Sequence, residues 1–235
     1  MNPEDATNPS SPEQKKRGWL EIVSYGFIYG CIAIGILVCV LMYFGSSPPR
    51  AAWKADANTA VSNARSVGLA LFSFQNEYGA FPSDETRADV EEEFGTSIDL
   101  SGPSSNALLR QLFAAEIIDS EEIFFAKIKG HKKPDGLITP GNILEPGECN
   151  FAYISGLSTS GASSTPLLIT PIIPGTKKFD RKPFGGCAVV LRIDQSVQLL
   201  PIHKDGYAYD KSGIDILSPD HPAWNGTAPD IRYPE

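Results

Sequence analysis

The sequence is poor in the residues that most often carry chemistry or bind nucleic acid. It has only three histidines and four cysteines in 235 residues, and its 20 lysines and arginines are outnumbered by 28 aspartates and glutamates. Because DNA and RNA are bound through clustered basic side chains that neutralise phosphates, a net charge of −8 argues against nucleic acid as a partner. His131, His203 and His221 are too scattered to show the ligand spacing of a zinc site.

A hydrolytic signature is also missing. None of the serines lies in Gly-x-Ser-x-Gly, the turn that exposes the nucleophile of α/β-hydrolases. The members of a catalytic triad meet only in space, so the sequence pattern alone does not exclude one. Since no positive signal for catalysis is present, we expect a protein that is not an enzyme and needs no cofactor.

Charge is absent from one long stretch of the chain. No charged residue lies between Glu21 and Arg50, and residues 25–44 read YGFIYGCIAIGILVCVLMYF. About 20 apolar residues in a helix span the hydrocarbon core of a bilayer. Within lipid the backbone must satisfy its hydrogen bonds inside the segment, which requires a helix. We therefore predict a transmembrane helix over residues 22–45.

Three other interpretations of this stretch stay open. A helix buried in a protein core is usually shorter and keeps a polar face, which this stretch lacks. A secretory signal peptide has an apolar segment of about 7–15 residues, but the small residues Ala51, Ala52 and Ala55 would allow cleavage here. Cys31 is a candidate for lipid attachment, although the apolar stretch continues well past it.

Basic residues flank the apolar stretch unevenly. Residues 15–17, Lys-Lys-Arg, form a cluster before it, whereas Arg50 and Lys54 follow it more widely spaced. Because cytoplasmic flanks carry the excess of Lys and Arg, we predict the N-terminus in the cytoplasm and the C-terminal domain outside. Residues 1–21 have few apolar side chains to bury and are predicted to be a disordered basic leader.

A second helix is predicted directly after a break in the chain. Residues 46–49, Ser-Ser-Pro-Pro, oppose helix formation, so residues 46–54 are predicted as a linker. Over residues 55–78 apolar side chains recur in steps of three and four, which predicts an amphipathic stem helix. Gly79 is placed to end this helix in the left-handed conformation, and Pro82 prevents its continuation. The apolar stripe consists of Ala57, Ala60, Ala64, Val67, Leu71, Phe74 and Tyr78.

The segment that follows the stem helix is rich in turns. Residues 89–93 contain three consecutive glutamates, typical of a solvated helix face or loop. Residues 104–106, Ser-Ser-Asn, can cap a short helix over residues 107–115. Residues 130–147 contain three prolines and are predicted to form an ordered loop.

Near residue 150 the apolar period changes to that of a strand. Pro171 interrupts one of the predicted strands and places it at an edge of the sheet. The last two predicted strands, residues 187–193 and 196–202, are joined by a predicted two-residue hairpin turn at Asp194 and Gln195. Strands after a long helix predict an α+β fold in which the stem helix packs on a small, mainly antiparallel sheet. The predicted strands are residues 150–157, 167–173, 187–193 and 196–202.

The order of these features resembles a known family. A basic leader ends at Gly18, a single apolar helix follows, and the stem helix ends in residues 76–82, Asn-Glu-Tyr-Gly-Ala-Phe-Pro, before a small sheet with a hairpin. This resembles the type IV pilin-like proteins, especially the pseudopilins of type II secretion, and within them the variable pseudopilin-like proteins of Verrucomicrobia and Planctomycetes. The resemblance implies a bacterial inner-membrane protein with a periplasmic pilin-like domain over residues 55–235.

The resemblance also implies a processing site. The family is cleaved after a Gly that precedes an aromatic residue, and a Glu at the fifth position of the mature chain aligns each subunit that enters the filament. Gly18 and Trp19 match the cleavage pattern, but the fifth position is Val23 and the nearest acid is Glu21. Gly18, Trp19 and Glu21 are therefore the candidate processing residues of a divergent relative.

Two further sites are candidates in the exported domain. Cys149 and Cys187 each begin a predicted strand and would form a disulfide in an oxidising compartment, with two buried free thiols as the alternative. Asp205, Asp210 and Asp215 recur every five residues and offer the hard oxygen ligands that Ca²⁺ prefers. Some pseudopilins bind calcium in their C-terminal loop. The spacing is not that of an EF-hand, so solvated turn aspartates are the alternative.

Small residues in the apolar stretch suggest how such a protein would assemble. Helices in lipid associate where small side chains allow close packing, and Gly26, Gly30 and Gly35 lie near such a seam. Glycine is also common in membrane spans without any such role. With the resemblance, this predicts a structural or assembly protein whose partners are the membrane and either other pseudopilin-like subunits or itself. The competing prediction is a monomeric, unprocessed anchored domain that binds a ligand or acts as a sensor.

The mature N-terminus separates the two predictions. If the family's peptidase cleaves after Gly18, intact-mass and N-terminal peptide mass spectrometry of the protein from its native membrane should find a chain that begins at Trp19. A chain that still begins at Met1 would contradict processing and favour the monomeric anchored domain.

Overall fold

The computed structural model describes residues 29–39, 49–95 and 97–235. The chain divides into two units, Met1–Pro49 and Arg50–Glu235. All of the strands belong to the second unit, which contains the domain predicted from the sequence.

In the first unit, residues 29–39 form a helix with exposed side chains. No helix in the described part of the chain combines the length and the apolarity needed to cross a membrane. The predicted leader, residues 1–21, and most of the predicted transmembrane helix, residues 22–45, lie outside the described residues. These two predictions therefore stay predictions.

The predicted stem helix is present as α2, Pro49–Tyr78. It begins six residues earlier than expected, so residues 49–54 of the predicted linker are helical. Proline is compatible with the first turn of a helix, where its missing N–H has no partner to lose. Gly79 ends the helix as predicted, with φ of 75° and an N–H that donates to the carbonyl of Gln75 at 2.8 Å.

The apolar stripe of α2 is the face that packs into the core, as its spacing predicted. Every member from Ala57 to Phe74 is at most 1% exposed. Tyr78 is partly buried, stacks on Phe74 with ring centroids 4.4 Å apart, and donates from its hydroxyl to Glu93 at 2.9 Å. The opposite face of α2 stays exposed at Lys54, Arg65 and Leu69.

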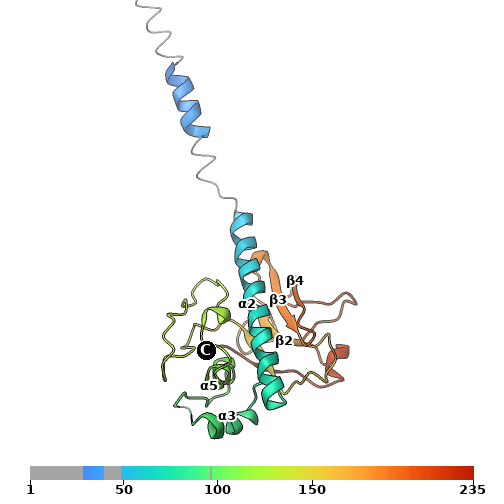
Figure 1. Ribbon diagram of the computed structural model, residues 1–235. Helices are drawn as coiled ribbons and strands as arrows, with labels where there is room; N and C mark the ends of the chain where they lie inside the picture. Colours follow the sequence, from blue (N-terminus) through green and yellow to red (C-terminus); the bar gives the residue numbers. More distant parts are fainter. Residues whose placement is uncertain (1–28, 40–48, 96) are drawn as a thin grey trace, which may run out of the picture. The chain divides into compact units, whose positions relative to one another are not determined.

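A five-stranded antiparallel sheet, in the order β4-β3-β2-β1-β5, packs against α2. Figure 1 labels α2 and the strands β2, β3 and β4. The predicted α+β class and antiparallel pairing are confirmed. The predicted edge position of the second strand is wrong, because β2 lies between β3 and β1. The strand ends at Thr170, so Pro171 lies just beyond it and removes no hydrogen bond from the sheet. The strands are β1 (Ala152–Ser155), β2 (Pro166–Thr170), β3 (Cys187–Arg192), β4 (Val197–Pro201) and β5 (Asp230–Arg232).

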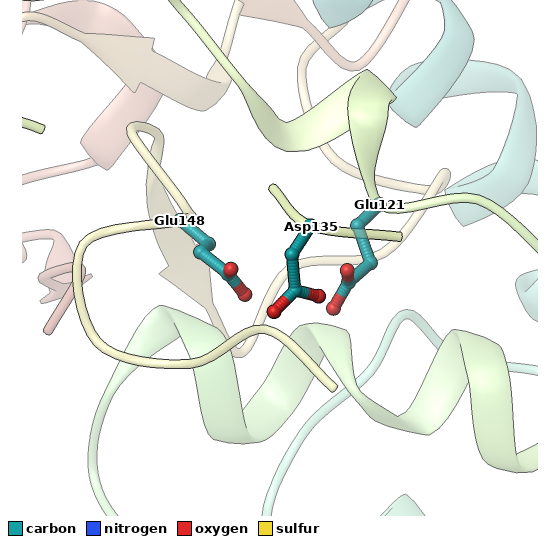
Figure 2. Close-up of side chains that lie close together, drawn as sticks. All are labelled: Glu121, Asp135 and Glu148. Atoms are coloured by element: carbon teal, nitrogen blue, oxygen red, sulfur yellow. The ribbon is translucent and has the colours of Figure 1, made fainter. Parts of the chain in front are cut away.

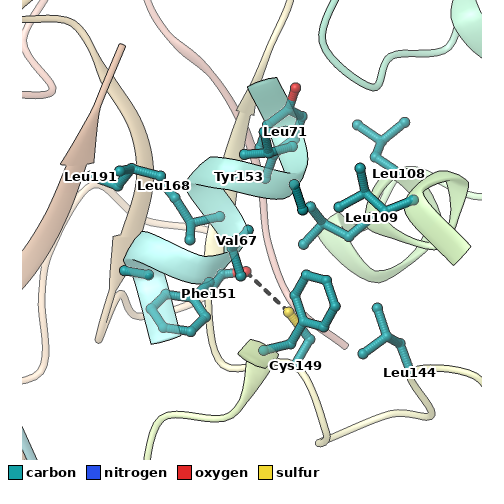
Figure 3. Packing of buried hydrophobic residues seen from close by; sticks show 14 of the residues in the cluster. Val67, Leu71, Leu108, Leu109, Leu144, Cys149, Phe151, Tyr153, Leu168 and Leu191 are labelled. Atoms are coloured by element: carbon teal, nitrogen blue, oxygen red, sulfur yellow. Dashed lines mark hydrogen bonds between the residues drawn. The ribbon is translucent and has the colours of Figure 1, made fainter. Parts of the chain in front are cut away.

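Both faces of the central strands are buried, each in a different apolar cluster. Tyr153, Leu168 and Leu191 point to the side of the sheet on which Val67 and Leu71 of α2 lie (Figure 3). The neighbours of these residues along each strand, Ile154, Ile169 and Val190, point to the other side of the sheet, where residues of the C-terminal segment pack on them. This second cluster contains Ile154, Ile169, Val190, Ile216, Leu217 and Trp224.

The β3–β4 hairpin is present, but its turn is longer than predicted. Arg192 N–H donates to Ser196 O at 3.0 Å, and Gln195 N–H donates to Arg192 O at 2.9 Å. The loop is therefore Ile193, Asp194 and Gln195, with Gln195 at φ of 64°. This pattern is a three-residue hairpin loop whose last residue is left-handed.

The short helices α3, α4 and α5 lie between α2 and the sheet in sequence. Ser104 caps α4 as predicted, since its hydroxyl accepts a hydrogen bond from Ala107 N at 3.1 Å. Gln111 in α5 is fully buried, accepts from the Thr86 hydroxyl at 2.7 Å and donates to Ser83 O at 2.8 Å, which ties α3 to α5. The elements are α3 (Thr86–Phe94), α4 (Ser105–Leu109), α5 (Gln111–Ala114) and the 3₁₀ turns η1 (Glu122–Phe124), η2 (Pro183–Gly185) and η3 (Pro222–Trp224).

Gly185 offers a test of how the first turns of α2 are held. A Cβ at Gly185 would lie 2.6 Å from the Trp53 ring, and its φ is 66°. Gly186 is also left-handed, at φ of 81°, but a Cβ there would lie 3.7 Å from its nearest neighbour. Gly186→Ala should therefore lose only the conformational preference, about 1 kcal/mol. Gly185→Ala should lose about 1–3 kcal/mol more, because the indole must move.

Urea unfolding of the two variants measures this difference. Equal losses for Gly185→Ala and Gly186→Ala would contradict the close contact between Gly185 and Trp53.

Candidate functional site

Three carboxylates from separate loop segments converge in the second unit. Glu121 immediately precedes η1, Asp135 lies in the predicted ordered loop, and Glu148 follows that loop. One carboxylate oxygen from each lies within 4.8 Å of those of the other two. Figure 2 shows Asp135 between Glu121 and Glu148, with the three carboxylates turned toward the same region. We call these three residues the carboxylate cluster.

Glu121 is fully buried, and only one of its oxygens has a partner. Oε1 accepts a hydrogen bond from Leu144 N at 2.5 Å, whereas Oε2 has no hydrogen-bond partner among the described residues. Burial raises the pKa of the Glu121 carboxyl, and the negative charge of Glu148 adds to this, although the Leu144 amide lowers it. An unpartnered, buried carboxylate oxygen is costly unless a proton or a cation compensates it.

Glu148 is positioned by the turn that contains it. Residues 145–148 read Glu-Pro-Gly-Glu, Gly147 has φ of 89°, and Glu148 N donates to Glu145 O at 3.0 Å. Proline followed by a glycine of positive φ is the pattern of a type II turn. The Glu148 side chain folds back to accept from Glu145 N at 2.9 Å and is fully buried.

Asp135 connects the carboxylate cluster to solvent. Its side chain is 35% exposed. Oδ1 accepts from Leu137 N at 2.9 Å, which orients the carboxylate within its own turn. A cation could therefore reach the two buried glutamates from the side of Asp135.

A lysine ammonium already lies beside the carboxylate cluster. Lys132 Nζ is 2.9 Å from Glu148 Oε1 and 3.6 Å from Asp135 Oδ2, and it also bonds Glu145 Oε2. Hydrogen bonds to Glu145 and Glu148 raise the pKa of Lys132. If Glu121 is ionised with the others, four carboxylates face one ammonium and leave a net charge of −3.

The loop that carries Asp135 is fixed to the short helices through its backbone. Arg110 Nε donates to Ile143 O at 2.8 Å, and Asn106 Nδ2 donates to Leu144 O at 2.9 Å. The same stretch of loop supplies the Leu144 amide that holds Glu121. The cluster is therefore built on an anchored loop, and its chemistry is that of a hard, anionic oxygen site.

The sequence-predicted calcium residues do not converge. Asp205, Asp210 and Asp215 each accept a hydrogen bond from the amide two residues further along, at 3.0, 2.8 and 3.2 Å respectively. In the described part of the chain, the carboxylate cluster is the one place where three such groups lie close enough to hold a metal. The aspartates are turn residues, which was the alternative interpretation.

An open groove of about 550 Å³ borders these turns. Its lining includes His203, Asp205 and Tyr209. The Tyr209 hydroxyl donates to Asp205 Oδ2 at 2.7 Å, and the rings of His203 and Tyr209 meet edge to face with centroids 4.7 Å apart. The groove thus has aromatic and charged walls.

The predicted disulfide is absent, and both cysteines are free thiols. Cys149 is buried in the cluster on the α2 side, where its sulfur contacts Phe151 O at 3.5 Å and Ser105 Oγ at 3.9 Å. Burial raises the pKa of the Cys149 thiol to about 11. Cys187 begins β3 and is partly exposed. Cys149 precedes β1, and β2 separates β1 from β3 in the sheet, which explains why the two do not pair.

Most of the candidate residues near the N-terminus lie outside the part of the chain that the structure describes. Gly18, Trp19, Glu21 and Gly26 lie outside the described residues. Gly30 and Gly35 lie in the helix over residues 29–39, and a Cβ at either would meet no atom within 4 Å. Their role in helix packing stays a prediction.

Sequence reasoning missed the carboxylate cluster because its members are far apart in sequence and lie in irregular segments. The turn signals around them were visible, in Asp135-Gly136 and in residues 145–148. Nothing in the sequence marks Glu121 as buried, since glutamate is almost always exposed unless paired.

The chain was compared with protein-family models, with curated proteins and with solved structures, and none of the three comparisons gives a match.

Asp210 tests whether the C-terminal aspartates act as turn residues. Its carboxylate accepts from both Ser212 N and Ile214 N, at 2.8 and 2.9 Å, and these bonds lower its pKa. Asp210→Ala should cost about 1–3 kcal/mol of stability at neutral pH, measured by urea unfolding. Because the pKa is lowered on folding, this contribution is present above about pH 4 and is lost as pH falls through the folded-state value.

Asp220→Ala is the matched control. Among the described residues the Asp220 side chain accepts one hydrogen bond, from the Ser218 hydroxyl at 3.3 Å, and Asp220 N donates to Ser218 Oγ. Asp220→Ala should lose less stability than Asp210→Ala. A loss in Asp210→Ala that appears only when calcium is present would contradict the turn role and support the original calcium prediction.

Proposed function

We propose that this chain is a structural or assembly protein of the pseudopilin type. One helix over residues 22–45 holds it in a bacterial inner membrane, with the N-terminus in the cytoplasm and residues 55–235 in the periplasm. It acts beside other pseudopilin-like subunits or copies of itself, in a type II secretion or type IV pilus-like system. It is not an enzyme.

The observation that carries the proposal is the relation of α2 to its neighbours in sequence and in the fold. This 30-residue helix follows the uncharged stretch almost at once and packs one apolar face on an antiparallel sheet. A stem helix on a small antiparallel sheet is the domain that the resemblance implies. The absence of any charge between Glu21 and Arg50 supports the membrane anchor.

The solvent-facing side of α2 also supports an assembly role. Leu69 is 61% exposed although it lies midway along a helix whose other face is buried. Subunits that pack side by side through their stems would cover this side chain together with the apolar stretch before it. An isolated exposed leucine is common on monomers, so Leu69 supports the proposal only in combination with the anchor.

The alternative is a monomeric anchored domain that binds a ligand. The groove beside His203, Asp205 and Tyr209 is the specific observation that favours it, because concave surfaces with a few polar groups are typical of binding sites. The departure from the family at Val23 also fits this alternative, since subunit alignment uses a Glu at that position. The groove is open and lies on the surface, so we rank it second.

A measurement of self-association through the predicted seam at Gly26, Gly30 and Gly35 tests the proposal. Gly30→Leu should weaken self-association in a membrane two-hybrid assay several-fold, because the larger side chain keeps the helices apart. Ile36→Leu, which exchanges one large apolar residue for another, should leave the signal unchanged. An unchanged signal in Gly30→Leu would contradict the prediction that the helices associate through these glycines.

Fractionation provides the necessary control for location. The full chain and both variants should remain with the membrane after alkaline extraction, and protease added outside the inner membrane should digest the C-terminal domain. Recovery of the full chain in the soluble fraction would contradict the anchor, the topology and the assembly role together.

A further inference from the structure

The carboxylate cluster has two features that a surface group of acids lacks. Glu121 and Glu148 are both fully buried, so their charges cannot be screened by water as surface charges are. Glu121 Oε2 is buried without a hydrogen-bond partner among the described residues, and its carboxylate turns toward those of Asp135 and Glu148. A buried carboxylate oxygen that lacks a hydrogen-bond donor is expected where a cation compensates its charge.

The spacing of the oxygens suits calcium. Each offered oxygen lies within 4.8 Å of the other two. Two oxygens on opposite sides of a Ca²⁺ ion are about 4.8 Å apart, because Ca–O distances are about 2.3–2.6 Å. Three oxygens within this limit can be gathered around one ion of this size. Mg²⁺ needs distances of about 2.0–2.1 Å and near-ideal octahedral geometry, which three carboxylates on irregular segments meet less readily.

We propose that Glu121, Asp135 and Glu148 form a calcium site, with Lys132 as the internal cation that calcium displaces. The three ligands are carboxylates, which favour hard cations over zinc or copper. Water and loop carbonyls would complete the coordination, as in many calcium sites. This inference goes beyond the proposed function and does not rest on it.

Lys132 explains how the carboxylate cluster can be stable both without calcium and with calcium bound. Without calcium, its ammonium lies between Glu148 and Asp135 and neutralises part of the negative charge. Its side chain is 45% exposed and its stem is long, so it can swing into solvent when a divalent ion enters. The outer partner Glu145 is 35% exposed and can accompany the lysine.

Calcium would connect three separate segments of the chain. Glu121 leads into η1, Asp135 belongs to the predicted ordered loop, and Glu148 leads toward β1. The η1 turn is held to α2, since Asn63 Nδ2 donates to Glu122 O at 3.0 Å and to Phe125 O at 2.7 Å. Binding should therefore stabilise the whole domain and not the loop alone.

The test uses the full chain, purified in detergent and freed of divalent ions with a chelator. Calorimetric titration with CaCl₂ should show one site with a dissociation constant of about 10⁻⁴–10⁻³ M, the range of extracellular calcium modules. Calcium should also raise the thermal unfolding midpoint more than the same concentration of MgCl₂ does.

Three variants decide which residues are responsible. Glu121→Gln should weaken calcium binding about tenfold or more and abolish the thermal shift, since it removes one ligand charge. Lys132→Met should tighten calcium binding about tenfold, because the competing ammonium is gone. Glu122→Gln is the matched control, because Glu122 is adjacent but 70% exposed and pairs with Lys133. It should bind calcium like the unmodified chain.

Two results would overturn the proposal. The first is the absence of calcium heat and thermal shift in both the unmodified chain and Lys132→Met, which would make the cluster a lysine-neutralised ion pair only. The second is equal weakening by Glu121→Gln and Glu122→Gln, which would mean diffuse attraction to surface charge. Neither result would bear on the membrane anchor, which is tested separately by fractionation.

Discussion

The close approach of α2 to the sheet is the contact on which the rest of the domain depends. The buried stripe of the helix uses small residues in its first half, at Ala57, Ala60 and Ala64, and large ones after Val67. Gly68 sets the distance, because a Cβ there would lie 3.1 Å from Leu191 Cδ1 on β3. A helix this close to a sheet leaves no room for water, and a fully buried side chain gains about 1.5–3 kcal/mol over an exposed one. The helix and the three central strands therefore define one core.

Because α2 covers only one face of the sheet, the chain must cover the other face by different means. The C-terminal segment does so without long regular elements. Trp224 inserts into the second apolar cluster and donates from Nε1 to Ile216 O at 2.7 Å, so the indole is both packed and satisfied. β5 then pairs with β1, and Ser105 N donates to Tyr233 O at 2.9 Å, which brings the end of the chain back to α4. Turns capped by Asp205, Asp210 and Asp215 make this irregular cover possible.

The parts of the fold that were predictable are those encoded within a few neighbouring residues. The stripe of α2, its stop at Gly79 and the Ser104 cap each depend on local spacing, and all three are present. Errors arose where a long-range choice decided the outcome. Pro171 reads as an edge signal only if it lies inside the strand, and β2 ends one residue before it. The disulfide required knowing that β2 separates β1 from β3. The carboxylate cluster required knowing that Glu121 is buried, which no pattern around it reveals.

The electrostatics of Glu121 differ in kind from those of Asp205 and Asp210, whereas Asp215 resembles Glu121, because burial raises its pKa although the Leu217 amide lowers it. Asp205 and Asp210 are stabilised by hydrogen bonds from their own turns, which lower their pKa values and leave no charge uncompensated. In Glu121 burial outweighs the lowering effect of the Leu144 and Gly136 amides, so its pKa is raised. A turn that satisfies its own carboxylate has no need of a cation, whereas a buried pair of glutamates with one lysine does. In the site that we propose, a cation would be held where the protein does not satisfy the carboxylate oxygens by itself, and not where acids recur at a regular spacing in the sequence.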